Sequence, residues 1–390
     1  MRGRFATYLP LRFIASLCII FSFWMPLGTY DADLIFWNAF PSAVATMLIC
    51  LGCLAVAPWV ALRLIGLSVS AATLILLPTA ESFGGLENLL NQLLGLGSEP
   101  ALFQMGLSAS GFWLALIGIA LFTWIVMADL AAMPRNRWRD IAIPLIFGLL
   151  LVYLWQAIVI GFAVPKVLLP APAAIAQAIR NGAATLADDF AQTFLKSVLA
   201  GFVIGNAIGF ATALLADRYP FLQRGLLPLG NFASAVPIIG IAPIMVMWFG
   251  FGWESKSAVV VLMIFFPMLV NTLAGLNAAD RMSLDLMRSY GAGYVQTLLK
   301  LRLPMALPFI FNALKINSTL ALIGAIVAEF FGSPTAGMGF RINIENARMG
   351  LDVVWATIAV AAVAGSAFYG ILALLERAFT FWHPSYRAQN

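Results

Sequence analysis

Apolar runs long enough to form membrane-spanning helices recur along the chain. A helix needs about 20 apolar residues to cross the hydrocarbon core, and helices are favoured there because lipid satisfies no backbone hydrogen bonds. Ten stretches fit this pattern. They lie at 11–28, 42–61, 63–79, 111–131, 141–162, 193–216, 228–250, 257–277, 305–331 and 352–375. We therefore expect an all-α, polytopic membrane protein with about ten transmembrane helices.

Two details of this pattern need interpretation. Only Leu62 and Arg63 separate the second and third stretches, which form either a hairpin or one broken element. The first stretch follows Arg2 and Arg4, as in a signal peptide, but it ends at Trp24-Met25-Pro26 without a small-residue cleavage site. We interpret it as a retained first span.

The basic residues predict the orientation. With ten spans and the N-terminus inside, fifteen of the 22 Lys and Arg residues fall on inside segments, six fall outside, and Lys315 lies in a span. Cytoplasmic loops of membrane proteins carry such an excess. Both termini are therefore predicted to be cytoplasmic.

Composition supports the membrane interpretation. The chain is 62% hydrophobic and 10% charged, whereas soluble domains are near half apolar and a quarter charged. Its net charge of +5 is spread along the chain, which favours membrane orientation over nucleic-acid binding. A basic, proline-bearing segment at 133–139 suggests an extra N-terminal membrane module over 1–140, with about four spans, and a six-span domain over 141–390.

Few residues are suited to catalysis or metal binding. His383 is the only histidine, and Cys50 and Cys53 are best interpreted as small residues packed in a helix. The stretch from Gly250 to Ser257 resembles a phosphate-binding loop, but Ser255 replaces the second glycine and no strand precedes it. We expect no catalytic residue, metal site or cofactor in this chain, and any ATP to be bound by another chain.

The inside segment 277–304 is longer than a helix hairpin needs. Its mixture of basic and apolar residues indicates short amphipathic helices at the membrane face. Gly291 is suited to ending one helix, and Pro304 to starting the next span. Such a helix either is gripped by a soluble partner or lies on lipid.

The spacing within this segment resembles the "EAA" loop of bacterial ABC-importer permeases. Asp285-Leu286-Met287 is followed by Arg288-Ser289-Tyr290, then Gly291, nine residues and Leu301-Arg302-Leu303-Pro304. The opening triplet departs from Glu-Ala-Ala. Further segments are similar to nitrate/sulfonate/taurine-type permeases, so the resemblance covers about 141–390. They are Leu169-Pro170-Ala171-Pro172, the stretch from Pro237 to Pro243, Trp248-Phe249-Gly250, Phe266-Pro267, Asn271-Thr272 and Gly337-Met338-Gly339-Phe340.

The resemblance implies the membrane-spanning subunit of a binding-protein-dependent importer in the bacterial cytoplasmic (inner) membrane. Two permease subunits, expected as a homodimer, would form the path. A cytoplasmic ATP-binding subunit would grip the loop, and a periplasmic or lipid-anchored protein would deliver a sulfonate, taurine, nitrate, pyrimidine or riboflavin-like solute. The residues expected to couple to the ATPase are Asp285, Leu286, Met287, Arg288, Gly291, Leu301, Leu303 and Pro304.

Several residues within the spans are candidates for the solute path. Pro237 and Pro243 are expected to break the seventh helix, as in many transport paths, and Trp248 and Asn271 are further candidates. Glu329 is either a functional carboxylate or a hydrogen-bonded structural one. Gly201, Gly205 and Gly209 instead form a smooth face suited to helix packing.

Two rival classes remain. A secondary transporter or channel working without an ATPase would need ion-coupling groups in the spans, and only Glu329, Lys315 and Asp129 are available. A membrane enzyme would need a cluster of acid, base or nucleophilic groups, which the sequence does not indicate.

Overall fold

The computed structural model describes residues 9–22, 25, 28–30, 33–35, 110–133, 137–162, 164–234, 237–332 and 335–381. The predicted spans 42–61 and 63–79 lie outside these residues, as do Cys50, Cys53 and His383. The chain forms two compact units, Met1–Gln177 and Ala178–Asn390. The division predicted at residue 140 stays a prediction.

The first unit contains helices α2 (Leu9–Ser22), α6 (Ser110–Ala131) and α7 (Arg137–Gly161), and a hairpin of strands β1 (Gly28–Tyr30) and β2 (Asp33–Ile35). The strands are antiparallel, with Gly28 opposite Ile35. Helices α2 and α6 pack through a small apolar core that includes Ala15, Ile19 and Phe122.

The predicted first span, 11–28, is wrong at its C-terminal end. Helix α2 ends at Ser22, whose hydroxyl donates a hydrogen bond to Ile19 O at 2.6 Å, and Gly28 already belongs to a strand. Pro26 has no backbone N–H and cannot continue a helix ladder. An apolar run alone therefore overestimates the helix.

Helix α8 (Pro172–Asn181) leads into the second unit, which is entirely helical in the residues described. Its elements are α9 (Ala183–Phe190), π-helical segment η3 (Ala191–Val198), α10 (Leu199–Arg218), α11 (Pro220–Ser234), α12 (Ile238–Phe249), α13 (Trp253–Asn277), α14 (Arg281–Ser289), α15 (Tyr294–Thr297), π-helical segment η4 (Leu298–Arg302), α16 (Leu303–Gly332), α17 (Met338–Ala347) and α18 (Leu351–Phe379).

Among the residues that the structure describes, six helices are long and apolar enough to cross a membrane, and each overlaps a predicted span. They are Phe112–Ala131, Trp138–Gly161, Ala183–Arg218, Trp253–Asn277, Tyr294–Gly332 and Leu351–Phe379. Apart from the short hairpin, the described chain is helical. The prediction of an all-α polytopic membrane protein is confirmed.

The predicted seventh span, 228–250, is two helices instead of one. Helix α11 ends at Ser234, and α12 begins at Ile238 after Pro237, which has an extended backbone (φ −69°, ψ 122°). Proline lacks a backbone N–H and disfavours helix in the residue before it. Pro243, by contrast, lies inside α12 and does not end it. The prediction that proline breaks this helix holds for Pro237 alone.

Helices α10, α13 and α16 form the centre of the second unit. Gly201, Gly205 and Gly209 of α10 face α13 so closely that a Cβ on Gly205 would lie 2.6 Å from Ile264 Cγ1. Buried Asn317 of α16 donates hydrogen bonds to Asn206 Oδ1 at 2.7 Å and to Ile264 O at 3.1 Å. The predicted packing role of the three glycines is confirmed.

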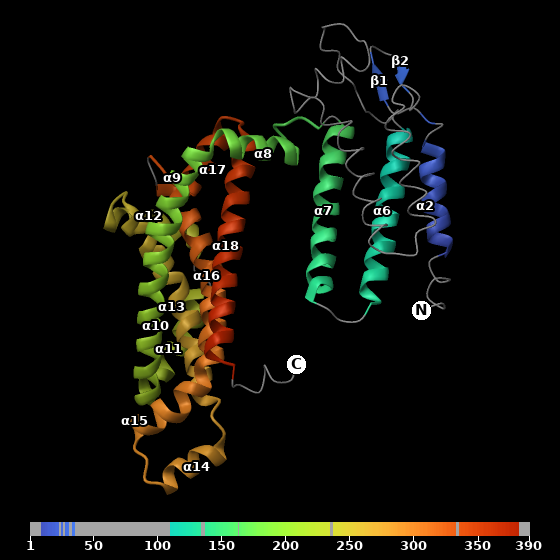
Figure 1. Cartoon of the computed structure of the whole chain (residues 1–390). Coiled ribbons are helices and arrows are strands. Elements are labelled where there is room, and N and C mark those ends of the chain that lie inside the picture. Colours follow the sequence, from blue (N-terminus) through green and yellow to red (C-terminus); the bar gives the residue numbers. More distant parts are fainter. Residues whose placement is uncertain are drawn as a thin grey trace. The chain divides into compact units, whose positions relative to one another are not determined.

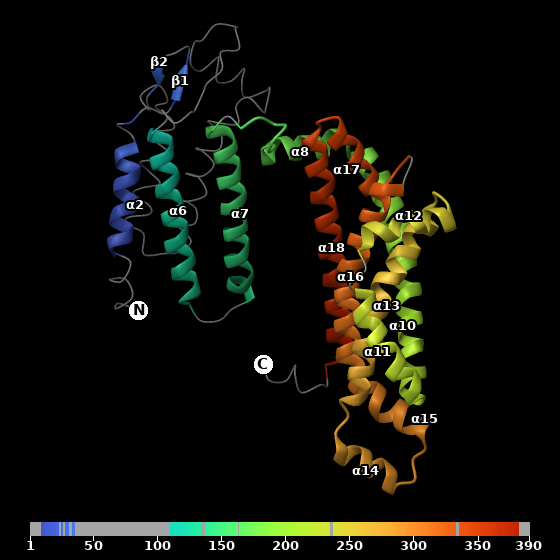
Figure 2. The same ribbon diagram turned by 180° about the vertical axis from the view of Figure 1, so that it is seen from behind.

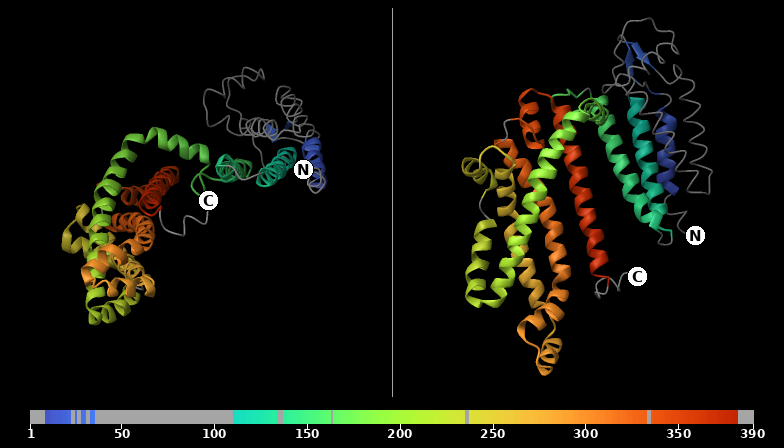
Figure 3. Two further views of the ribbon diagram at one scale, coloured as in Figure 1. Left: turned by 60° about the horizontal axis from the view of Figure 1, so that its bottom comes forward. Right: turned by 60° about the vertical axis from the view of Figure 1, so that its left-hand side comes forward.

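The two ends of this bundle carry different short helices. Figures 1 and 2 show α14 beyond one end of the long helices and α17 at the opposite end. The right-hand view of Figure 3 shows the same projection of α14, coloured orange. We refer to these as the α14 end and the α17 end of the bundle.

Candidate functional site

Helix α14 is a short amphipathic helix without a buried residue. Met282 is 79% exposed and Leu286 is 56% exposed, and Met287 is half-buried. Asp285 and Arg288 form an ion pair at 3.3 Å, with their side chains 72% and 80% exposed. The helix therefore presents apolar and charged side chains away from the bundle, as the sequence predicts.

Gly291 ends α14 in a left-handed conformation. Its φ is +69°, and its N–H donates to Arg288 O at 2.9 Å, while Ala292 N–H donates to Met287 O at 3.0 Å. These bonds satisfy carbonyl groups that a helix end leaves unpaired, and glycine adopts this φ without steric cost. Gly291 thus fixes the direction in which the chain leaves α14.

Pro304 lies at the start of α16, as predicted, but α15 and η4 continue directly into that helix. The continuous helical stretch formed by α15, η4 and α16 runs from Tyr294 to Gly332. Within it, the π-helical segment η4 ends just before α16, in whose first turn Pro304 lies. Proline donates no hydrogen bond to the preceding turn, and π-helical turns accommodate such local mismatches. Leu301, Leu303 and Pro304 are half-buried within this helix.

An ion-pair cluster ties the α14 end of the bundle together. The guanidinium of Arg302 donates to both carboxylate oxygens of Asp217, at 2.6 and 2.8 Å, and to Leu276 O at 2.9 Å. Tyr294 Oη donates to Asp217 Oδ2 at 2.7 Å. Asp217 lies in the last turn of α10, Leu276 in the last turn of α13, and Arg302 at the end of η4, just before α16. One bidentate pair therefore connects three helices.

A cavity of about 360 Å³ lies between α14 and this cluster. It is lined by Leu276, Asn277, Leu284, Arg288, Ala292, Tyr294, Thr297 and Arg302. Leu284 thus faces the bundle side of α14, whereas Leu286 is exposed. Helix α14 is therefore separated from the ion-pair cluster by this cavity, and the turn at Gly291 connects it to α15.

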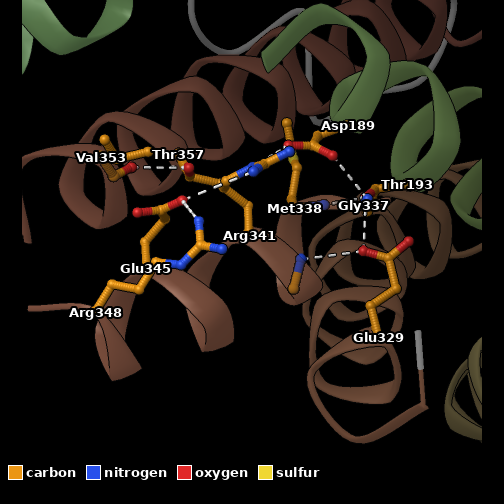
Figure 4. Close-up of polar contacts among 11 residues, drawn as sticks. Asp189, Thr193, Glu329, Gly337, Met338, Arg341, Glu345, Arg348, Val353 and Thr357 are labelled. Carbon is orange, nitrogen blue, oxygen red and sulfur yellow. Dashed lines mark hydrogen bonds and ion pairs between the residues drawn. The ribbon is translucent and has the colours of Figure 1, made fainter. Parts of the chain in front are cut away.

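A second polar cluster holds the N-terminus of α17 (Figure 4). Gly337 N–H donates to Asp189 Oδ1 at 2.8 Å, Met338 N–H to Thr193 Oγ1 at 2.7 Å, and Gly339 N–H to Glu329 Oε2 at 3.1 Å. The first amide groups of a helix have no partners within it, and their positive end favours carboxylates. Asp189 also accepts from Arg341 Nε at 2.7 Å.

Glu329 is buried in this cluster, with 1% exposure. Its Oε2 also accepts a hydrogen bond from Thr193 Oγ1 at 2.7 Å. Gly337 has a φ of +130°, and a Cβ there would lie 2.6 Å from Glu329 Cδ. Glycine at position 337 therefore leaves room for the Glu329 carboxylate, which any larger side chain there would contact.

Nearby, a buried lysine closes the same end of α16. Lys256 is 1% exposed, and its Nζ donates to Phe251 O at 2.8 Å and to Gly332 O at 2.7 Å. A cation at the C-terminus of a helix pairs with its free carbonyl groups.

Comparison with known proteins agrees with this geometry. Residues 205–381 match the family of binding-protein-dependent transport system inner membrane components. A probable ABC transporter permease of Haemophilus influenzae is 34% identical over 217 residues, 56% of this chain and 88% of the relative. The riboflavin transport system permease of Chloroflexus aurantiacus is 30% identical over 258 residues, 65% of this chain and 94% of the relative. The chain belongs to this family of ABC transporter permeases.

A taurine transport system permease of Escherichia coli is 32% identical over 188 residues, 48% of this chain and 65% of the relative. The sulfonate- and taurine-like subgroup is thus confirmed for this permease. It is a multi-pass membrane protein, and relatives in the family are transporters, not enzymes.

The path candidates fall into three places in the permease. Pro237 directly precedes α12, Pro243 and Trp248 lie within it, and all three are exposed, Trp248 by 71%. Asn271 of α13 is half-buried; its Nδ2 donates to Pro267 O at 2.8 Å, and its Oδ1 accepts from Asn312 Nδ2 of α16 at 3.4 Å. Glu329 lies in the α17-end cluster instead. Its role in the path stays untested.

Sequence reasoning did not single out most of these polar partners. Asp189, Thr193, Asp217 and Tyr294 meet their partners across 77 to 148 residues of chain. One signal was available, because a charged residue in or beside an apolar span requires a partner. That rule points to Asp189, Asp217 and Lys256 but does not say which residue each one meets.

We predict that Asp217→Asn destabilises the permease by about 3 kcal/mol, because it leaves the Arg302 guanidinium without its countercharge in a mostly buried site. Thermal unfolding in detergent measures this. Asp285→Asn is the matched control, since its pair with Arg288 is exposed and contributes at most about 0.5 kcal/mol. Equal unfolding temperatures for the two variants would contradict the structural role of Asp217.

We predict that Thr193→Val lowers stability by about 2–3 kcal/mol. Valine has the same shape but removes the hydroxyl that bonds Met338 N–H and Glu329, so two buried groups each lose a partner. Thr319→Val is the control, because Thr319 is exposed and bonds only Ile316 O of its own helix. The same thermal unfolding assay compares them, and no difference would show that the cluster does not hold α17.

Proposed function

We propose that this permease forms the solute path of an ATP-driven importer and couples to a separate ATPase through the loop Asp285–Pro304. The observation that carries this proposal is the position of α14. It is solvent-exposed, and a glycine turn joins it to a helix that continues through the whole bundle. A partner that moves α14 therefore moves the α16 span.

The proposed partners follow from the family and from the two ends of the bundle. A cytoplasmic ATP-binding subunit binds α14, with Asp285, Leu286, Met287 and Arg288 as contact residues and Gly291 as the turn. ATP hydrolysis takes place in that subunit. A periplasmic or lipid-anchored binding protein delivers solute at the α17 end. We therefore propose that the permease lies in a bacterial inner membrane with both termini in the cytoplasm.

The path itself is proposed to lie between two copies of the permease, with Pro237, Pro243, Trp248 and Asn271 as lining candidates and Glu329 as a further one. The solute is a small organic or anionic nutrient. Relatives named for riboflavin, formylaminopyrimidine, sulfonate and taurine transport support that range.

Charge pairing gives less support to a secondary transporter or channel. Lys315 of α16 forms an ion pair with Glu376 of α18 at 2.6 Å, and Glu329 bonds the α17 turn. These two candidate ion-coupling groups therefore already have structural partners. Solute movement in liposomes without any ATPase subunit would favour this alternative.

We expect Leu286→Asp to abolish co-purification of the ATPase and ATP-driven uptake, because it places a charge on the exposed apolar face of α14. Its unfolding temperature should change little, since Leu286 is 56% exposed. Affinity purification followed by mass spectrometry and uptake assays measure both effects. Met349→Asn at the α17 end is the control; Met349 is 65% exposed with φ +63°, which asparagine tolerates. Retained ATPase binding by Leu286→Asp would refute the docking role.

We expect Gly291→Pro to abolish uptake while the permease still inserts in the membrane. Proline fixes φ near −65°, whereas Gly291 needs +69° and donates a hydrogen bond. Gly293→Ala is the matched control, because Gly293 has φ −71° and open space at its Cβ. If Gly291→Pro transports like the wild type, the loop does not transmit motion.

A further inference from the structure

An exposed stripe runs along α16, although this helix is otherwise packed at the centre of the bundle. Its members are Phe309, Asn312, Ile316, Thr319 and Ile323. Their spacing of three and four residues places them on one face of the helix. Phe309, Ile316 and Ile323 are 36%, 42% and 53% exposed. This stripe is open in the single permease chain.

The polar members distinguish the stripe from faces suited to lipid. The large hydrophobic residues exposed on α10 are Val203, Ile204, Ile208 and Leu215. The stripe of α16 instead carries an amide at Asn312 and a hydroxyl at Thr319. The Thr319 hydroxyl donates to Ile316 O at 2.8 Å, so the weakly bonded amide of Asn312 is the group that lipid would leave poorly paired, and such a group costs several kcal/mol there. The stripe is therefore suited to an aqueous path.

A second helix adds to the polar surface. Asn312 Nδ2 donates to Asn271 Oδ1 of α13 at 3.4 Å, a long and weak bond. Asn271 in turn donates to Pro267 O at 2.8 Å. Each asparagine offers both donors and an acceptor, so the pair has hydrogen-bonding capacity beyond these contacts.

The basic side chains of α13 and α16 already have partners within the protein. Helices α13 and α16 contain two basic residues, Lys256 and Lys315. Lys256 is buried against two carbonyl groups, and Lys315 pairs with Glu376 at 2.6 Å. A solute that approaches the stripe therefore meets amide and hydroxyl groups between apolar side chains. It meets no cationic side chain there.

We propose that Asn271, Asn312 and Thr319 contact the transported solute, and that this solute is an uncharged organic compound. The proposed solute carries hydrogen-bond donors and acceptors on an apolar ring. Its polar groups would bond the amides, and its ring would contact Phe309 and Ile316. An anionic solute such as a sulfonate finds no countercharge on this surface. This assignment rests on the proposed importer function and narrows its solute class.

The test uses the permease assembled with its ATPase and binding protein in proteoliposomes. The probes are riboflavin and an aminopyrimidine, which are uncharged, and taurine and nitrate, which are not. ATP-dependent uptake of an uncharged probe, without uptake of taurine or nitrate, is the expected result. Uptake of taurine or nitrate overturns the solute class. So does a complex that hydrolyses ATP but moves neither uncharged probe.

Variants test the contact residues. Asn312→Leu should lower uptake of the uncharged probe by at least tenfold through KM, and Asn312→Gln should restore part of it. Ser366→Leu, an exposed polar position on α18, should leave uptake within twofold. Wild-type uptake by Asn312→Leu overturns the assignment. Failure of the complex to assemble or to require ATP instead refutes the proposed importer function, so the two failures are distinguishable.

Discussion

Pairing of buried charge is the constraint on which the bundle depends. Lipid offers no partner to an ion or a backbone group, so each must find one within the protein. Asp217 meets Arg302, Asp189 meets Arg341, and Lys315 meets Glu376. Each pair joins helices that are distant in sequence. The charges that make the chain costly to insert therefore also specify which helices lie together.

Both ends of the bundle use a π-helical turn to place a residue in a polar cluster. Segment η3 brings Thr193 to Glu329 and Met338, and η4 brings Arg302 to Asp217. A π turn inserts one extra residue into a helix and so rotates the side chains that follow. Neither segment follows from apolar periodicity, which continues through both.

The helices could be predicted from sequence because hydrocarbon thickness fixes their length and composition. The failures occur where another force decides the end of an element. Pro237 breaks a continuous apolar run, α2 stops before Gly28, and the helical stretch that ends in α16 already begins among polar loop residues at Tyr294, with α15. For the candidate site, the spacing of Asp285, Gly291 and Pro304 predicted an exposed loop helix. The same spacing could not predict the contacts of Asn312 or Asp217, because their partners are distant in sequence and become neighbours only in the folded bundle.

The unbroken helix from Tyr294 to Gly332 has a mechanical consequence. At 1.5 Å per residue, its 39 residues extend about 57 Å, roughly twice the hydrocarbon thickness. A tilt of about 10° around its midpoint displaces each tip by ~5 Å, in opposite directions, given that length. Arg302 is near one tip and Glu329 near the other. A helix of this length that tilts as one body would act as a lever, and a push at its foot would shift Glu329 and its hydrogen bond to Gly339 N–H of α17.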